Sequence, residues 1–113
     1  MRFYLRSKIH NATVTEANIE YVGSITIDPV LIRKAGFDVG EKVYVWDTTN
    51  GERLETYVIE GKENSGEICM NGAAARKIQK GDRVIIAGFE LTGQYIKPTI
   101  VLVDEHNRFK EFL

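Results

Sequence analysis

An internal repeat constrains the fold of this chain more than any other feature. One copy runs from Ile25 to Val45 and the other from Ile68 to Ile86. Each copy reads as a strand, a short helix, a turn of glycine, acidic and basic residues, and a second strand. Two such units related by a pseudo-twofold axis, with interleaved strands, can close a small barrel that has no exposed strand edge. The sequence therefore predicts a mainly β fold with short helices.

Alternating side chains and turn residues define the individual elements. Strands are predicted over 3–9, 21–27, 42–47, 53–60 and 95–103, with a short extended piece at 13–15. Asp28-Pro29 is typical of a helix start and Gly36 of a helix end, so a helix is expected between them. Asn50-Gly51 predicts a hairpin turn. Residues 88–94 are expected to turn, and the charged tail from Asp104 to fray or to dock on a neighbouring subunit.

Length and composition exclude several classes of protein. A chain of 113 residues is expected to form one domain with one core. A net charge of −1 argues against a nucleic-acid binder with a broad basic face. The single Cys69 excludes an intrachain disulfide, and no His/Cys/Asp cluster has metal-ligand spacing. No apolar run is long enough to span a bilayer, so we expect a cytoplasmic protein without a membrane partner.

The dipeptide Gly23-Ser24 offers an unusual chemistry. A serine hydroxyl can attack the carbonyl just before its own nitrogen when the backbone is held strained and donors stabilise the oxyanion. Elimination from the resulting ester cuts the chain and leaves dehydroalanine, which loses ammonia to become a pyruvoyl group, a ketone cofactor. Gly-Ser is also a common loop dipeptide, so an ordinary turn is the competing interpretation.

Other residues fit a decarboxylation at such a ketone, although each also has a purely structural interpretation. Lys8 and Arg53 are cations that can bind a carboxylate, or solvated strand residues. Thr56 offers a hydroxyl, and Tyr57 offers a phenol that can equally serve packing. The residues of 71–75, Asn-Gly-Ala-Ala-Ala, can approach an anion through backbone N–H groups, or simply cap and build a helix.

Four motifs, taken together, resemble the bacterial aspartate 1-decarboxylase family. They are Ser7-Lys8-Ile9-His10, Tyr21-x-Gly23-Ser24, Trp46-x-x-Thr49-Asn50-Gly51-x-Arg53-x-x-Thr56-Tyr57, and Asn71-Gly72-Ala73-Ala74-Ala75. The resemblance implies a double-psi β-barrel, a homotetramer, and self-cleavage at Gly23-Ser24 into a β chain (1–23) and an α chain (24–113). It also implies decarboxylation of L-aspartate to β-alanine for pantothenate synthesis.

The resemblance further implies a role for each matching residue. Ser24 becomes the covalently bound pyruvoyl group that forms a Schiff base with the substrate, and Tyr57 donates a proton. Thr56 binds substrate and stabilises the oxyanion of self-cleavage, and the backbone of Gly72, Ala73 and Ala74 also binds substrate. Lys8 and Arg53 lie beside the pyruvoyl group, where we expect them to hold the side-chain carboxylate. Supporting roles are expected for His10, Tyr21, Trp46 and Asn71.

Two other functions remain open from the sequence. The segment from Ser24 to Val43 is similar to a swapped-hairpin DNA-binding module, although such modules are about half this length and carry a basic face. The chain could instead be a small barrel without catalytic activity that binds a partner. Neither alternative needs both the Arg53-x-x-Thr56-Tyr57 motif and the Asn71 to Ala75 motif.

Overall fold

The two copies of the repeat pair with each other in a way that is consistent with a pseudo-twofold axis. In the computed structural model, which describes residues 1–113, the first copy contains β3 (Ser24–Ile27), α1 (Pro29–Ala35) and β4 (Lys42–Asp47). The second contains β6 (Ile68–Asn71), a 3-10 helix η1 (Gly72–Arg76) and β7 (Arg83–Thr92). Strand β3 pairs antiparallel with β6, and β4 pairs antiparallel with β7. Like strands therefore meet like strands across the two copies.

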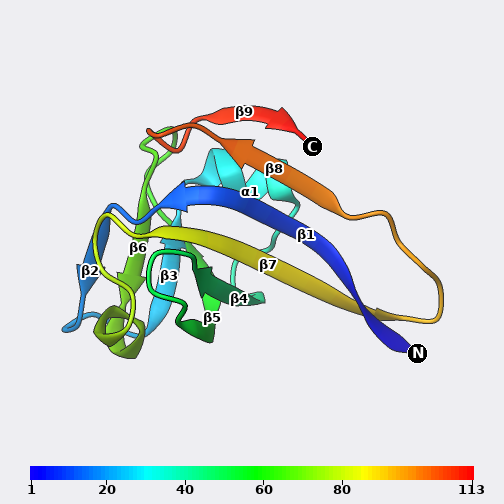
Figure 1. The fold of residues 1–113 in the computed structure, drawn as a ribbon, viewed down its shortest axis with the longest axis horizontal. Helices are drawn as coiled ribbons and strands as arrows, with labels where there is room; N and C mark the ends of the chain where they lie inside the picture. The colour runs from blue at the N-terminus through cyan, green and yellow to red at the C-terminus, as the bar shows by residue number, and fades with distance from the viewer.

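The barrel closes through one extended segment that changes partners. Strand β1 (Arg2–Thr13) pairs with β7, and after Val14 and Thr15 the chain continues as β2 (Glu16–Asn18), which pairs with β6. Strand β5 (Arg53–Glu60) joins the halves because it pairs antiparallel with β4 and parallel with β3. Figure 1 shows β1 and β7 running side by side across the molecule, with β2, β3 and β6 at one end. The prediction of a mainly β small barrel with short helices is confirmed.

The core and the caps follow from the sequence pattern. Inward-facing aliphatic side chains of both copies, including Ile25, Val43, Met70 and Ile86, are completely buried. Asp28 caps α1 by accepting a 2.9 Å hydrogen bond from the Val30 N–H, and Gly36 ends the helix with a left-handed φ of 71°. The predicted helix bounds and the Asn50-Gly51 hairpin between β4 and β5 are both confirmed.

Several element boundaries differ from the predictions, and the first strand, β1, runs from Arg2 to Thr13 rather than over residues 3–9. Strand β3 begins at Ser24 rather than at residue 21, and the short extended piece lies at Glu16–Asn18 rather than at 13–15. The predicted turn at 88–94 is wrong, because β7 continues to Thr92 along the N-terminal half of β1. The last predicted strand is shorter, β8 (Thr99–Val103), and the tail forms β9 (Phe109–Phe112) on its edge. Long-range pairing decided these segments, which carry weak local signals.

No helix of the structure is long and apolar enough to cross a membrane.

Candidate active site

Ser24 is a buried serine whose hydroxyl is held by two hydrogen bonds. It opens β3 directly opposite Asn71 of β6 and is 1% exposed. The Asn71 side-chain N–H donates to Ser24 Oγ at 2.8 Å, and Ser24 Oγ donates to the Val22 carbonyl at 3.2 Å. A surface turn would leave this hydroxyl to solvent. Its burial and fixed orientation favour a functional serine over the ordinary turn.

The backbone of Gly23 passes very close to Gly72. A Cβ at position 72 would lie 2.7 Å from Gly23 Cα and 2.9 Å from Gly23 N. Gly72 also has a left-handed φ of 68°, so two separate constraints require glycine there. Gly23 itself does not have a positive φ, and no peptide bond is cis. The unusual backbone of this site therefore lies at Gly72, against which the Gly23 segment packs.

Tyr57 lies next to Ser24 on the outer face of the barrel. Ile25 and Val58 form a register pair of the parallel strands β3 and β5 and both point into the core. Ser24 and Tyr57 directly precede that pair, so their side chains lie on the opposite, outer face. The Tyr57 side chain is 40% exposed, which leaves its phenol free to meet a ligand.

Thr56 does not share that face. It alternates with Tyr57 along β5 and pairs with Val43, whose side chain is completely buried. Its hydroxyl makes no side-chain hydrogen bond to Gly23, Ser24 or Asn71 in the single chain. The structure thus brings Tyr57, but not the Thr56 hydroxyl, to the face that carries Ser24.

Two residues that the sequence analysis did not assign to the site complete the surroundings of Ser24. The second N–H of the Asn71 side chain donates to Thr26 Oγ1 at 2.9 Å, and Cys69 Sγ donates to Asn71 Oδ1 at 3.1 Å. Alternation along β3 and β6 predicts that Ser24, Thr26, Cys69 and Asn71 share a face. Their hydrogen bonds could not be foreseen, because the register of the two strands is a tertiary property.

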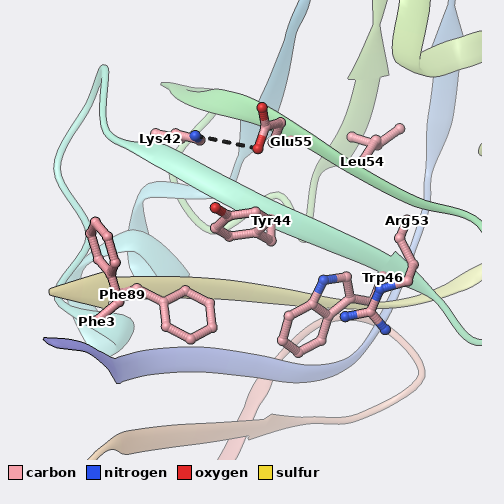
Figure 2. A pocket seen from close by; sticks show the side chains of 8 residues that line it. All are labelled: Phe3, Lys42, Tyr44, Trp46, Arg53, Leu54, Glu55 and Phe89. Atoms are coloured by element: carbon pink, nitrogen blue, oxygen red, sulfur yellow. Dashed lines mark ion pairs between the residues drawn. The ribbon is translucent and has the colours of Figure 1, made fainter. Parts of the chain in front are cut away.

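Trp46 and Arg53 line a separate pocket of about 780 Å³ on the outer face of β4 and β5. Figure 2 shows the Arg53 guanidinium beside the Trp46 ring, with its Cζ 4.6 Å from the ring centroid. Tyr44 and Phe89 pack edge to face, with their ring centroids 5.4 Å apart. The other residues of the wall are Phe3, Lys42, Leu54 and Glu55.

Four aromatic and three charged side chains line this pocket together with Leu54. Lys42 Nζ lies 3.3 Å from Glu55 Oε2, and the hydrogen bond and charge of Glu55 raise the pKa of Lys42. Arg53 has no carboxylate partner within ion-pair distance, so its guanidinium is available to an anionic ligand. The sequence analysis identified Trp46 and Arg53 but missed Phe3, Tyr44 and Phe89, which three different strands bring together.

Lys8 and His10 lie on the side of the barrel that carries this pocket. Lys8 pairs with Ala87 of β7, which in turn pairs with Tyr44 of β4. Because paired residues project to the same face, Lys8 and Tyr44 share the outer face, and His10 lies one alternation further along β1. Both side chains are partly buried.

The predicted residues other than Thr56 form two groups in the single chain, which β5 connects because Tyr57 and Arg53 lie on the same face of that strand. One group surrounds the ends of β3 and β6 and contains Gly23, Ser24, Tyr57, Asn71 and Gly72, with the Tyr21 carbonyl beside Gly72 and with Ala73 and Ala74 in η1. The other contains Lys8, His10, Trp46 and Arg53 on the outer face of β1, β4 and β5. No hydrogen bond or ion pair links the two groups. The chain also contains no group of three His, Cys, Asp or Glu side chains that could hold a metal ion.

Comparison with known proteins identifies the family of this chain. Residues 1–110 match the family model described as aspartate decarboxylase. The aspartate 1-decarboxylase of Clostridium botulinum is 54% identical over 111 residues, which cover 95% of this chain and 87% of that protein. The enzymes of the same name from Caldicellulosiruptor bescii and Wolinella succinogenes are each 56% identical, over 92% and 91% of this chain and 84% and 88% of their own lengths. This chain therefore belongs to the aspartate decarboxylase family.

Proposed function

We propose that this chain cuts its own Gly23–Ser24 bond and then decarboxylates L-aspartate to β-alanine and CO2, which supplies pantothenate synthesis. The observation that carries the proposal is the buried Ser24 hydroxyl, oriented by Asn71 and placed where Gly72 lets the Gly23 backbone approach closely. The family match over residues 1–110 supports the substrate and favours the enzyme over the DNA-binding and non-catalytic alternatives.

Self-cleavage needs only the atoms of the chain and one water molecule. Ser24 Oγ bonds to the Gly23 carbonyl carbon, the Gly23–Ser24 C–N bond breaks, and the hydroxyl proton passes to the released amine. Loss of the Ser24 α-proton then expels Gly23 as a carboxylate and leaves a Cα=Cβ double bond at residue 24. Water then displaces the nitrogen of residue 24, which leaves as ammonia, and the oxygen of that water becomes the ketone oxygen. In this sequence Asn71 holds Ser24 Oγ, and Gly72 fixes the position of Gly23.

The surroundings of Ser24 fit a pyruvoyl group at this position. A ketone oxygen accepts hydrogen bonds but cannot donate them. That oxygen takes the place of the Ser24 nitrogen, because Ser24 Oγ leaves with Gly23, and the Asn71 side chain that donates to Ser24 Oγ supplies a hydrogen-bond donor beside residue 24. The group supplies an electrophilic carbonyl that takes up the substrate amine and withdraws electrons from the substrate α-carbon. Asn71 would hold the group, with Tyr57 beside it on the outer face.

Tyr57 is the proposed proton donor of turnover. Its phenol lies on the same face as Ser24 and is partly open to solvent, so it can deliver a proton to the carbon that loses CO2. We propose that Thr56 and the backbone of Gly72, Ala73 and Ala74 contact the substrate, as the family resemblance implies. Arg53 and Lys8 are the proposed partners of the side-chain carboxylate. A carboxylate held by a guanidinium stays bound, whereas the α-carboxylate must remain free to leave.

We propose a homotetramer, because in the single chain the proposed carboxylate-binding residues lie apart from the group of residues around Ser24. Exposed apolar side chains surround the cleavage site, with Ile19 45%, Tyr21 54% and Val22 73% exposed. Such a patch is typical of a surface that another protein chain covers. We propose that the assembly brings Lys8, Trp46 and Arg53 of one chain to the Ser24 group of another.

Mixing two inactive variants tests this arrangement. The Arg53→Ala chain keeps Ser24 and should self-cleave, whereas the Ser24→Ala chain keeps Arg53 and should stay intact. Each variant alone is expected to have little aspartate decarboxylase activity, and unfolding and refolding them together should restore part of it. A mixture no more active than its separate components would show that one chain supplies both groups. Release of CO2 from labelled aspartate measures the activity.

A further inference from the structure

Four buried polar side chains form one connected network, the Asn71 network, beside the bond that is proposed to break. It consists of Ser24, Thr26, Cys69 and Asn71, which are 1%, 9%, 5% and 3% exposed. Asn71 is its centre: the amide donates to both hydroxyls and accepts from the Cys69 thiol. The mechanism above uses only Ser24 and Asn71, so the presence of Cys69 needs its own explanation.

The two ends of an asparagine amide have nearly the same shape but opposite hydrogen-bonding character. The hydroxyls of Ser24 and Thr26 can donate or accept, so they would satisfy either orientation of the Asn71 amide. A thiol is different, because its S–H can donate while its sulfur accepts only weakly. Cys69 is therefore the one member of the Asn71 network that distinguishes the amide oxygen from the amide nitrogen.

The thiol keeps the proton that this role requires. Burial raises the pKa of Cys69 to about 11, with further contributions from the charges of Glu16 and Glu67. Cys69 is accordingly a neutral S–H donor throughout the neutral pH range, 3.1 Å from Asn71 Oδ1. A thiolate would repel the amide oxygen and favour the reversed orientation.

We propose that Cys69 is a positioning residue for self-cleavage, whose S–H group fixes the Asn71 amide with its NH2 toward Ser24. This inference rests on the proposed function. With the amide in this orientation Asn71 donates to Ser24 Oγ, and a donor at that oxygen favours its deprotonated, nucleophilic form. In the reversed orientation Ser24 would donate its own proton to Asn71 Oδ1, and its ionisation would be disfavoured.

Cys69→Ala and Cys69→Ser form a matched pair that tests the inference. The two side chains are similar in size, but only serine restores a donor to Asn71 Oδ1. Cys69→Ala should cut Gly23–Ser24 at least about fivefold more slowly than the parent, the rate equivalent of about one net hydrogen bond. The cleavage rate of Cys69→Ser should stay within about twofold of the parent rate, which is a smaller change than the loss of one net hydrogen bond would cause. The uncut fraction, followed by intact mass after synthesis, gives both rates.

Each outcome separates this inference from the function on which it rests. A parent chain that never cuts would contradict the proposed function. A parent that cuts, with Cys69→Ala and Cys69→Ser equal to each other, whether both fast or both slow, would overturn the role of the thiol alone.

Raman spectroscopy provides a second test that does not require cleavage. Cys69 is the only cysteine, so the S–H stretching band of the Ser24→Ala chain is unambiguous. We expect that band below the frequency of a free thiol, and we expect Asn71→Ala to move it upward. A band that Asn71→Ala leaves in place would contradict the hydrogen bond.

Discussion

Substitution of Gly72 by alanine should slow self-cleavage strongly without unfolding the barrel. The new Cβ would lie 2.7 Å from Gly23 Cα and 3.1 Å from the Tyr21 carbonyl oxygen. Ordinary contact begins at 3.4 Å, so Gly23 must retreat by about 0.7 Å. Alanine at a φ of 68° also carries about 1–2 kcal/mol of backbone strain. A misplacement approaching 1 Å can cost as much as about 10²-fold in rate, so cleavage should slow by about 10- to 100-fold.

Gly51→Ala is the matched control for this experiment. Gly51 has a similar φ of 81° but no atom within 4 Å of its would-be Cβ, so it carries the strain without the overlap. Denaturant titration should show comparable losses of stability in the two variants, while the uncut fraction by mass spectrometry should differ strongly. If Gly72→Ala cleaves at the rate of Gly51→Ala, the close approach of Gly72 to Gly23 has no role in cleavage.

Three further substitutions test other parts of the account. Tyr57→Phe should still self-cleave but decarboxylate aspartate about 10²-fold more slowly, and an unchanged kcat would assign the proton donor elsewhere. Burial and the nearby Asp82 carboxylate raise the pKa of Asp47, whose Oδ2 is buried without a donor. Its folded state therefore binds more protons than its unfolded state, and this contribution to stability is lost as pH rises from the ordinary pKa of 3.8 through the raised value. Asp47→Asn should thus be more stable than the parent at neutral pH, and the difference in free energy of unfolding between the two should shrink as the pH falls. A difference in denaturant midpoint that stays constant with pH would refute the raised pKa of Asp47. Asn107→Ala removes three 2.8 Å hydrogen bonds to the backbone of Thr13 and Gly66 and should lower the free energy of unfolding by about 3 kcal/mol, whereas a change below about 0.5 kcal/mol would contradict that role.

The local signals in the sequence were strong enough to predict the repeat units. Asp28, Pro29 and Gly36 fix both ends of α1 through a cap, a preset φ and a left-handed stop. The repeat predicted a pseudo-twofold relation between two similar units, and in the structure β3 pairs with β6 and β4 with β7. The long β7 was missed because Gly88 interrupts its pattern, although Gly88 packs against Phe37 and Arg6, where a Cβ would be crowded.

The active site was only partly predictable. Sequence motifs identified the candidate residues. Which of them lie beside Ser24 depends on the register of β3, β5 and β6, and no local sequence pattern specifies that register. That register places Tyr57 and Asn71 beside Ser24 and turns Thr56 toward Val43. The hydrogen bond from Cys69 to Asn71 and the aromatic pocket around Trp46 are likewise products of strand pairing.

The intact mass of the denatured protein is the most direct test of self-cleavage, because it reports the Gly23–Ser24 bond without any assumption about the substrate. We expect two fragments for the parent, residues 1–23 and residues 24–113 with a ketone in place of the terminal amine, and one uncut chain for Ser24→Ala. A parent that remains a single chain after prolonged warming, or a Ser24→Ala chain cut at the same bond, would contradict it.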